Sequence, residues 1–272
     1  MRYFEIDINI PYEKAGILKK DYQAKLFAYV LDPLKIVNRP AVIICPGGGY
    51  RETSDREAEA VALQYMAMGY HAFVLRYSCA PDVWPTALLE LAYSVDYVRR
   101  HAEDWHITKD KIIIEGFSAG GHLVQSLATF WNQEFVYGPL GLTEEAIRPN
   151  GAILCYPVIT SGEFAHRGSF ENLLAGCDES LLAQTSLENQ AGPSNPPTFI
   201  WHTYEDQAVP VENSLLLAVN LRKHKVPLEL HIFPKGCHGL SLATKETGDK
   251  DERIIPSVQP WVSLSHTWIE NL

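Results

Sequence analysis

The chain carries a serine in a glycine-rich segment where it could act as a nucleophile. Residues 116–120 have the sequence Gly-Phe-Ser-Ala-Gly, directly after the apolar run 112–114 and directly before a helical pattern. In that setting G-x-S-x-G is typical of a sharp strand-to-helix turn whose small flanking residues let the backbone pass close by. The pattern alone is weak, because any turn rich in glycine and serine can match it. Its position between a strand and a helix makes Ser118 the candidate nucleophile.

A serine nucleophile needs a base to take its proton, and the base needs an acid to orient it. Asp206 follows the apolar run 198–201, and His238 follows the run 228–233. Both lie at the expected carboxyl ends of strands, where open α/β sheets gather their chemistry. The chain order serine, acid, histidine is also the one found with this type of turn. We therefore expect Ser118, Asp206 and His238 to be the catalytic residues.

Other histidines fit the role of the base less well. His202 and His231 lie inside expected strands and His224 lies on an expected helix, so structural roles are favoured for them. His122 follows the serine at the start of a helix, where a positive charge is disfavoured. We expect His122 to be a neutral, packed imidazole.

Three consecutive glycines follow the apolar run 41–45. Residues 46–50 have the sequence Pro-Gly-Gly-Gly-Tyr. A dinucleotide fingerprint would need a further glycine at Glu52, and a P-loop would need Gly-Lys-Ser/Thr, so neither phosphate site fits. Residues without Cβ let backbone N–H groups point at a developing negative oxygen. We interpret the segment as an oxyanion hole, with the N–H of Ala119 as the further donor.

Short apolar runs alternate with longer helical patterns along the chain. The runs are continuous rather than alternating, as expected of strands covered on both faces. They occupy residues 41–45, 72–75, 112–114, 152–155 and 198–201. A capping box at residues 54–57 predicts the start of a helix there, and a second helix opens at Pro85. Helices are also expected after Gly120 and over about residues 211–224. The pattern predicts an α/β fold: a mostly parallel central sheet with helices on both faces.

Two further stretches complete this architecture. Residues 3–10 and 24–32 alternate polar and apolar side chains and predict a leading antiparallel hairpin. Residues 160–195 are irregular and could be a plain connection or a lid-like insertion over a site, and we expect the insertion. An insertion of this size would be marginal as a separate unit, so we expect residues 1–272 to form a single domain.

Composition excludes several classes of partner. The 272 residues carry 23 Lys and Arg against 33 Asp and Glu, a formal net charge of −10, and there is no basic block to attract nucleic acid or anionic lipid. No run approaches the ~18 apolar residues that cross a bilayer, and the first residues lack a secretory pattern. The five cysteines contain no CxxC pair. We expect a cytoplasmic protein without metal, cofactor, nucleic-acid or membrane partners, and a homo-oligomer stays open.

Five segments in order resemble the α/β-hydrolase esterases. They are Pro-Gly-Gly-Gly-Tyr at 46–50, Arg-Tyr with Ala-Pro and Trp-Pro between 76 and 85, Gly-Phe-Ser-Ala-Gly-Gly-His at 116–122, Glu-Asp-Gln-Ala-Val-Pro at 205–210 and Gly-Cys-His-Gly at 236–239. The match is closest to bacterial acetyl esterases and acetylxylan-esterase-like carboxylesterases, relatives of hormone-sensitive lipase. The resemblance implies Gly48, Gly49 and Ala119 as oxyanion donors. The lipase relatives have histidine before the three glycines, whereas this chain has Pro46, which points to the sugar-ester branch.

The resemblance also implies a reaction. It implies a serine hydrolase that cleaves small carboxylic esters, acetyl groups on sugars or xylo-oligosaccharides in particular, through an acyl-enzyme. An amide-bond hydrolase, such as a peptidase or an arylformamidase, and a non-catalytic ligand-binding module are the alternatives on the same fold. Aromatic residues beside the motifs could contact a sugar or acyl group, or could simply fill the core. These candidates are Tyr50, Trp84, Phe117 and Tyr204.

Overall fold

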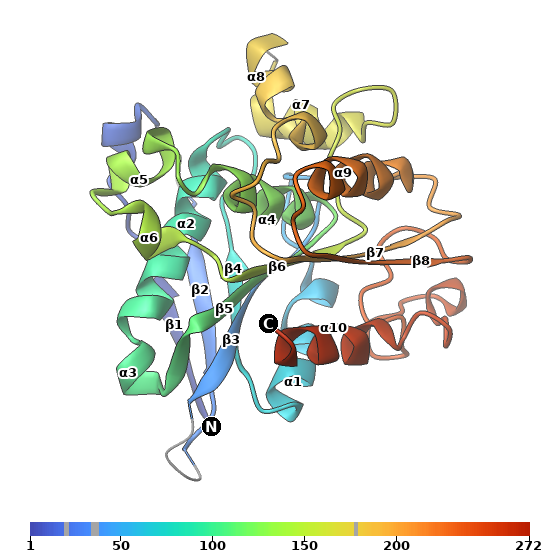
Figure 1. Cartoon of the computed structure of the whole chain (residues 1–272), viewed down its shortest axis with the longest axis horizontal. Helices are drawn as coiled ribbons and strands as arrows, with labels where there is room; N and C mark the ends of the chain where they lie inside the picture. The colour runs from blue at the N-terminus through green and yellow to red at the C-terminus, as the bar shows by residue number, and fades with distance from the viewer. Residues whose placement is uncertain (19–21, 34–37, 177–178) are drawn as a thin grey trace.

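A central sheet of eight strands organises the chain (Figure 1). The computed structural model describes residues 1–18, 22–33, 38–176 and 179–272, and all elements named below lie in that part of the chain. The strands follow the order β1-β2-β4-β3-β5-β6-β7-β8 across the sheet. Their bounds are β1 (Arg2–Asp7), β2 (Lys25–Val30), β3 (Arg39–Cys45), β4 (His71–Arg76), β5 (Ile107–Phe117), β6 (Gly151–Cys155), β7 (Thr198–Thr203) and β8 (Leu228–Phe233).

The direction of the strands matches the sequence prediction. β1 and β2 form the leading antiparallel hairpin, and β2 also runs antiparallel to β4. The remaining neighbouring pairs are parallel. β6 and β7 are buried along their whole length, which explains why their apolar runs are continuous rather than alternating. The mostly parallel sheet behind an antiparallel hairpin is therefore confirmed.

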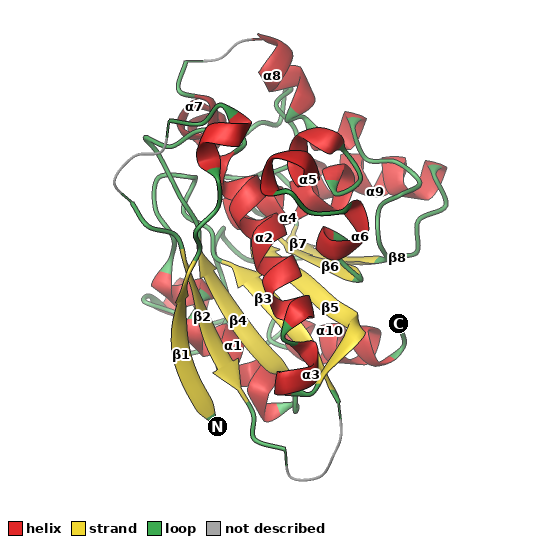
Figure 2. Cartoon of the chain, turned by 90° about the vertical axis from the view of Figure 1, so that its left-hand side faces the viewer, coloured by secondary structure: helices red, strands yellow, loops and turns green. Residues whose placement is uncertain are grey.

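Helices cover both faces of this sheet (Figure 2). α2, α4 and α9 contribute buried side chains to one core, and α1 and α10 contribute to a second core on the opposite face. The bounds are α1 (Glu59–Ala67), α2 (Thr86–Arg100), α3 (Ala102–Trp105), α4 (Ala119–Phe130), α5 (Glu134–Leu140), α6 (Glu144–Ile147), α7 (Arg167–Leu174), α8 (Glu179–Gln184), α9 (Glu212–Lys223) and α10 (Trp261–Glu270). Within the described segments, no helix combines the length and apolar character that a membrane crossing requires.

The expected capping box at residues 54–57 was wrong. The Ser54 side chain makes no capping hydrogen bond, a 3₁₀ turn covers Asp55–Glu57, and the helix begins two residues later, at Glu59. The Glu57 carboxyl instead turns inward, where its two oxygens accept hydrogen bonds from the N–H of Gly47 and the hydroxyl of Tyr156. Buried donors compete for a carboxyl group more strongly than a solvated helix end does, because an unpaired buried donor is costly.

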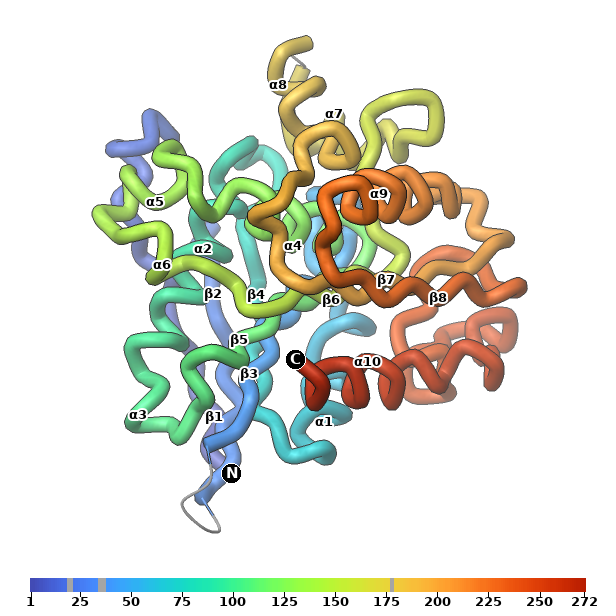
Figure 3. The backbone as a smooth tube through the Cα atoms, in the orientation of Figure 1, coloured from blue at the N-terminus to red at the C-terminus, as the bar shows by residue number. Residues whose placement is uncertain are grey.

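The irregular stretch 160–195 contains α7, α8 and a 3₁₀ turn at Leu187–Asn189. It leaves the carboxyl end of β6, and in Figure 3 α7 and α8 stand at one end of the molecule, beyond α4 and α9. Asn172 on α7 donates a hydrogen bond to the carbonyl of Gly49, and the carbonyl of Leu173 accepts one from the N–H of Trp84. The insertion is thus fastened to the loops that follow β3 and β4.

Candidate active site

Ser118 occupies a strained turn between β5 and α4. Its backbone angles are φ 53° and ψ −117°, a conformation that residues other than glycine rarely adopt. A Cβ on Gly116 would lie 2.1 Å from the carbonyl oxygen of Gly120, and one on Gly120 would lie 2.0 Å from that of Cys45. No side chain fits at either position, so the glycines of the motif are required by close backbone approach. The expected strand-to-helix turn is present.

The structure joins Ser118, His238 and Asp206 in one hydrogen-bonded chain. Oγ of Ser118 lies 2.7 Å from Nε2 of His238, and Nδ1 of His238 lies 2.6 Å from Oδ2 of Asp206. An ionised carboxylate only accepts, so Nδ1 carries the proton and Nε2 is left to accept from the serine hydroxyl. This tautomer is the one that a serine nucleophile requires of its base.

Asp206 is held as an anion by its surroundings. Its side chain is buried, and Oδ1 accepts hydrogen bonds of 3.0 Å from the N–H groups of both Ala208 and Val209. Burial raises the pKa of Asp206, but hydrogen bonds from His202 and His238 outweigh burial and hold the pKa well below its usual range. Asp206 therefore stays ionised at neutral pH and orients the imidazole of His238.

His202 supports Asp206 from behind, a structural role like the one expected from the sequence. It is fully buried, with Nε2 2.9 Å from the carbonyl of Val209 and 3.4 Å from Oδ2 of Asp206. Nδ1 lies 2.7 Å from the hydroxyl of Ser214. Since the Val209 carbonyl can only accept, Nε2 of His202 carries the proton and Nδ1 accepts from the hydroxyl of Ser214. The sequence showed the histidine but gave no signal for its contact with the acid.

In the loop after β3, hydrogen bonds to two backbone carbonyls set the direction of the N–H groups that follow them. The Gly47 carbonyl accepts from the N–H of Ser54 at 2.8 Å, and the Gly48 carbonyl accepts from that of Arg51 at 3.1 Å. In a trans peptide the N–H points away from the carbonyl that precedes it. The N–H groups of Gly48 and Gly49 therefore point away from the turn that binds those carbonyls.

These N–H groups start from a position beside the nucleophile. A Cβ on Gly47 would lie 3.0 Å from Cβ of Ser118, so the loop and the serine are in direct contact. Ala119 begins α4, where the first N–H groups of a helix have no partner within the helix. Among the described residues, none accepts a hydrogen bond from the backbone N–H of Gly48, Gly49 or Ala119. All three donors are available to an incoming anion.

Two residues that the sequence analysis missed lie behind this loop. Glu57 accepts from the N–H of Gly47 at 2.8 Å and from the hydroxyl of Tyr156 at 2.6 Å. The Tyr156 hydroxyl also accepts from the N–H of Ser241, and the centroid of its ring lies 5.1 Å from that of the His238 imidazole in a T-shaped arrangement. Glu57 thereby connects the loop with the residues that surround the base. Only the capping pattern drew attention to Glu57, and nothing in the sequence singled out Tyr156.

Tyr50 and His122 form a buried pair beneath the loop. The Tyr50 hydroxyl lies 2.9 Å from Nδ1 of His122, whose Nε2 lies 2.8 Å from the carbonyl of Thr185 in the insertion. Burial lowers the pKa of His122 to about 4, although the bond to Thr185 opposes this effect. His122 is therefore neutral and packed, as expected. With its hydroxyl paired and its ring buried, Tyr50 is placed to support the loop rather than to face solvent.

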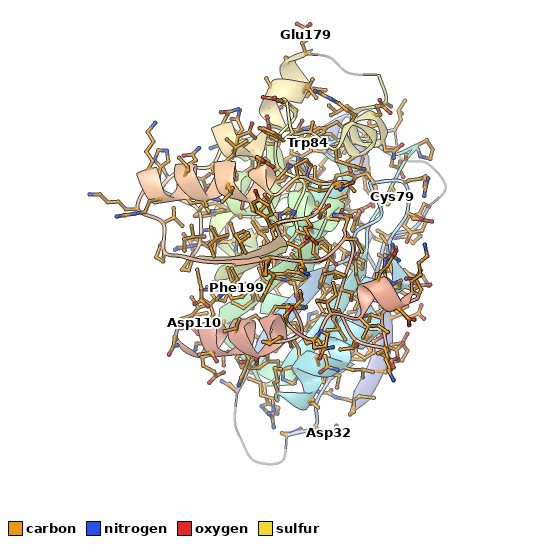
Figure 4. The ribbon with its side chains drawn as sticks, turned by 90° about the vertical axis from the view of Figure 1, so that its right-hand side faces the viewer. Asp32, Cys79, Trp84, Asp110, Glu179 and Phe199 are labelled. Carbon is orange, nitrogen blue, oxygen red and sulfur yellow. The ribbon has the colours of Figure 1, made fainter. Side chains whose placement is uncertain are left out.

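The other aromatic candidates lie in three different environments. Phe117 is fully buried in the core against Tyr156, a placement that favours packing over substrate contact. Trp84 packs on Phe130, the last residue of α4 and about 16 Å along the helix from its start, and in Figure 4 it lies below Glu179 of α8. Tyr204 is 70% exposed just beyond the end of β7. The ring contacts of Phe117 and Trp84 are thus with core residues, and a role of either ring in binding substrate stays a prediction.

Comparison with known proteins places this geometry in a family. A family model described as BD-FAE matches residues 30–221, a range that includes Ser118 and Asp206. The endo-1,4-beta-xylanase B of Butyrivibrio fibrisolvens is 38% identical over 226 residues, which are 81% of this chain and 35% of that protein. The acetylxylan esterase of Xylanibacter ruminicola is 30% identical over 75% of this chain and 42% of its own length. The chain thus spans less than half the length of these two relatives.

A solved structure shows the same likeness across the whole chain. The acetyl ester-xyloside bifunctional hydrolase from Caldicellulosiruptor lactoaceticus superposes with a TM-score of 0.87 at 36% identity. The superposition covers 99% of this chain and 96% of that one. Because the family model matches well over half of the residues and the fold agrees throughout, this chain belongs to the BD-FAE family and has the α/β-hydrolase fold.

Proposed function

We propose that this chain is a serine esterase that cleaves small carboxylic esters, with acetyl groups on xylose-based sugars as its natural substrates. The observation that carries the proposal is the hydrogen-bonded chain from Ser118 through His238 to Asp206, with bonds of 2.7 and 2.6 Å. A serine, a correctly protonated imidazole and an ionised acid in this order are the parts that acyl transfer needs.

The first half of the reaction acylates the serine. Oγ of Ser118 attacks the ester carbonyl while Nε2 of His238 takes its proton, and Asp206 stabilises the imidazolium that forms. The carbonyl oxygen becomes an anion in the N–H groups of Gly48, Gly49 and Ala119. His238 then gives the proton to the departing alcohol, which leaves an acetyl ester on Ser118.

The second half repeats these steps with water. His238 removes a proton from water, the resulting hydroxide attacks the acyl-serine, and the same N–H groups bind the oxyanion again. The proton returns from His238 to Oγ of Ser118 as acetate leaves. Each donor in such a hole contributes about 3 kcal/mol to transition-state stabilisation.

The proposed substrate class is supported by the names of the similar proteins. One is an acetylxylan esterase, another is a xylanase, and the structural neighbour is an acetyl ester-xyloside hydrolase. We also propose that residues 1–272 work as one domain. Ser118, Asp206 and His238 come from distant parts of the chain and share one sheet, so the site requires most of the sequence.

The nucleophile is tested by substitution and by labelling. We expect Ser118→Ala to lower kcat on p-nitrophenyl acetate by at least ~10⁴-fold and to abolish labelling by a fluorophosphonate probe. Ser126→Ala is the matched control, because that hydroxyl is also buried on α4 and donates to the carbonyl of His122, away from the triad. Wild-type turnover by Ser118→Ala would exclude the mechanism.

The substrate class is tested by a panel of esters and amides. We expect acetylated xylo-oligosaccharides and short p-nitrophenyl esters to be cleaved, with a decline as the acyl chain lengthens. Aminoacyl-amides and an aryl formamide are the comparison substrates. Faster turnover of the amides would favour the peptidase or arylformamidase alternative, and covalent labelling without turnover of any substrate would favour a binding module.

A further inference from the structure

The start of α7 places three polar side chains against the loop at residues 46–50, called the oxyanion loop below because it carries the N–H groups of Gly48 and Gly49. His166 directly precedes α7, and Ser169 and Asn172 lie on it three residues apart, on neighbouring positions of one side. Nδ2 of Asn172 donates to the carbonyl of Gly49 at 2.8 Å. A Cβ on Gly49 would lie 3.7 Å from Oγ of Ser169 and 3.9 Å from Cε1 of His166. The insertion thus contacts the loop through a polar edge.

His166 has one partnered and one unpartnered ring nitrogen. Nδ1 lies 2.8 Å from Oγ of Ser169, which is buried and holds the ring in place. Nε2 makes no hydrogen bond to any residue that the structure describes, and the ring is only half-buried. The imidazole is thus held in place beside Gly49 with Nε2 left to form a hydrogen bond with a bound molecule.

The imidazole of His166 also lies near the catalytic pair. Burial lowers the pKa of His166, the charge of His238 lowers it further, and the charge of Asp206 opposes both effects. Charges influence one another this way only over short distances in a protein. The ring lies beside the loop that would bind the oxyanion, and its surroundings favour the neutral imidazole.

We propose that His166 is a specificity-determining residue whose Nε2 binds a hydroxyl of the alcohol part of a sugar ester. This inference rests on the proposed function. An acetylated pyranose carries a free hydroxyl on the carbon next to the ester, so a group beside the oxyanion loop and the base is placed to meet it. A hydroxyl can both donate and accept, and it therefore pairs with Nε2 whichever ring nitrogen carries the proton. A simple aryl ester offers no such hydroxyl.

Two substitutions separate this role from a purely structural one. His166→Gln places an amide nitrogen near the position of Nε2 and loses the contact with Ser169. His166→Asn keeps a polar atom near Nδ1, and with it the contact to Ser169, but has nothing at the position of Nε2. The substrates are p-nitrophenyl acetate, a 2-O-acetyl xyloside and the same xyloside with its neighbouring hydroxyl replaced by hydrogen.

The proposal predicts a selective loss. On the acetyl xyloside, His166→Asn should lower kcat/KM about tenfold, and His166→Gln should stay within about twofold of wild type. On p-nitrophenyl acetate and on the deoxy xyloside, both variants should match wild type. His231→Asn is the matched control, because that imidazole lies on β8 with Glu229 as its partner, and it should leave all three substrates unchanged.

Other outcomes would overturn the proposal. A loss with His166→Gln but not with His166→Asn would show that the contact with Ser169 matters instead. Equal losses on all three substrates would assign His166 to holding the loop, and no loss on any would remove it from substrate binding. A wild type that cleaves p-nitrophenyl acetate but not the acetyl xyloside would overturn the sugar specificity and this inference together. Wild-type activity in Ser118→Ala would instead defeat the proposed mechanism itself.

Discussion

The two sides of the candidate site are built in different ways. On the nucleophile side, Ser118, Asp206 and His238 each come soon after a strand of the sheet. On the oxyanion side, the loop after β3 is held by side chains from elsewhere, among them Glu57, Tyr77 and Asn172. The sheet therefore positions the reacting groups directly, whereas the oxyanion donors depend on hydrogen bonds between loops.

This difference predicts how each side responds to substitution. A residue of the triad takes part in proton transfer, so its removal stops the chemistry while the fold stays intact. A residue that holds the loop acts only through the direction of the N–H groups, and several holders share that task. We expect large effects on the nucleophile side and smaller, graded effects on kcat on the oxyanion side.

Asp206→Asn should have a larger effect than any substitution on the oxyanion side. The amide has a donor as well as an acceptor, so it no longer requires a proton on Nδ1 of His238 and no longer stabilises the imidazolium. We expect kcat on p-nitrophenyl acetate to fall by about 10⁴-fold with little change in KM or in the melting temperature. Steady-state kinetics and thermal unfolding check this. A loss under tenfold would mean that the acid does not control the base.

Glu57→Gln should have an intermediate effect. Glutamine has one acceptor oxygen, so it cannot satisfy both the N–H of Gly47 and the hydroxyl of Tyr156. A lost bond to a carboxyl group is worth about 1.5 to 3 kcal/mol, and we expect kcat to fall by about 10- to 100-fold. A rise in KM with kcat unchanged would contradict a role in holding the oxyanion loop.

Asn172→Ala should have a smaller effect on the same side. It removes the 2.8 Å bond to the carbonyl of Gly49, while the carbonyls of Gly47 and Gly48 keep their own donors. A neutral hydrogen bond contributes about 0.5 to 1.5 kcal/mol, so we expect kcat to fall by about 2- to 10-fold on every ester. Asn132→Ala, at a half-buried position after α4, is the control and should leave kcat unchanged. An Asn172→Ala effect as large as that of Asp206→Asn would erase the distinction between the two sides.

The same difference explains what the sequence could reveal. Ser118, Asp206 and His238 could be predicted because the motif and the apolar runs mark strand ends, and parallel strand ends share one edge of a sheet. Glu57 showed only a capping pattern, since its partner Tyr156 lies 99 residues away. His166 and Asn172 lie in a stretch without strong periodicity. A long-range hydrogen bond leaves no local pattern to detect.

The aromatic candidates show a second limit of reasoning by sequence proximity. Phe117 stands next to Ser118, yet it is the last residue of β5 and its ring enters the core beside Trp261, whereas Ser118 lies in the turn that follows. Trp84 belongs to one of the motifs, but its ring packs against Phe130 at the far end of α4. A position next to a motif in the sequence therefore did not predict which way these two side chains point.

Glu115 supplies the smallest expected change in activity and a control for Glu57. It is fully buried on β5, three residues before Ser118, where it contacts the thiol of Cys155 and neither side of the site. We expect Glu115→Gln to leave kcat within about twofold of wild type. A tenfold loss would mean that burial of a carboxyl group, rather than its bond to the loop, explains the effect of Glu57→Gln.

Glu115 should instead affect the pH dependence of the protein's stability. Burial raises the pKa of Glu115 from 4.5 to about 8, although hydrogen bonds with Cys155 and Tyr65 offset part of this. Below pH 4.5 the Glu115 carboxyl of the wild type is protonated in both the folded and the unfolded protein. Between pH 4.5 and 8 only the unfolded protein releases this proton. The free energy of unfolding of the wild type therefore falls as the pH rises through this range. Glutamine does not titrate. The melting temperature of Glu115→Gln relative to wild type should therefore climb by several degrees between pH 5 and 9, and a constant difference would show that Glu115 is ionised in the folded protein throughout.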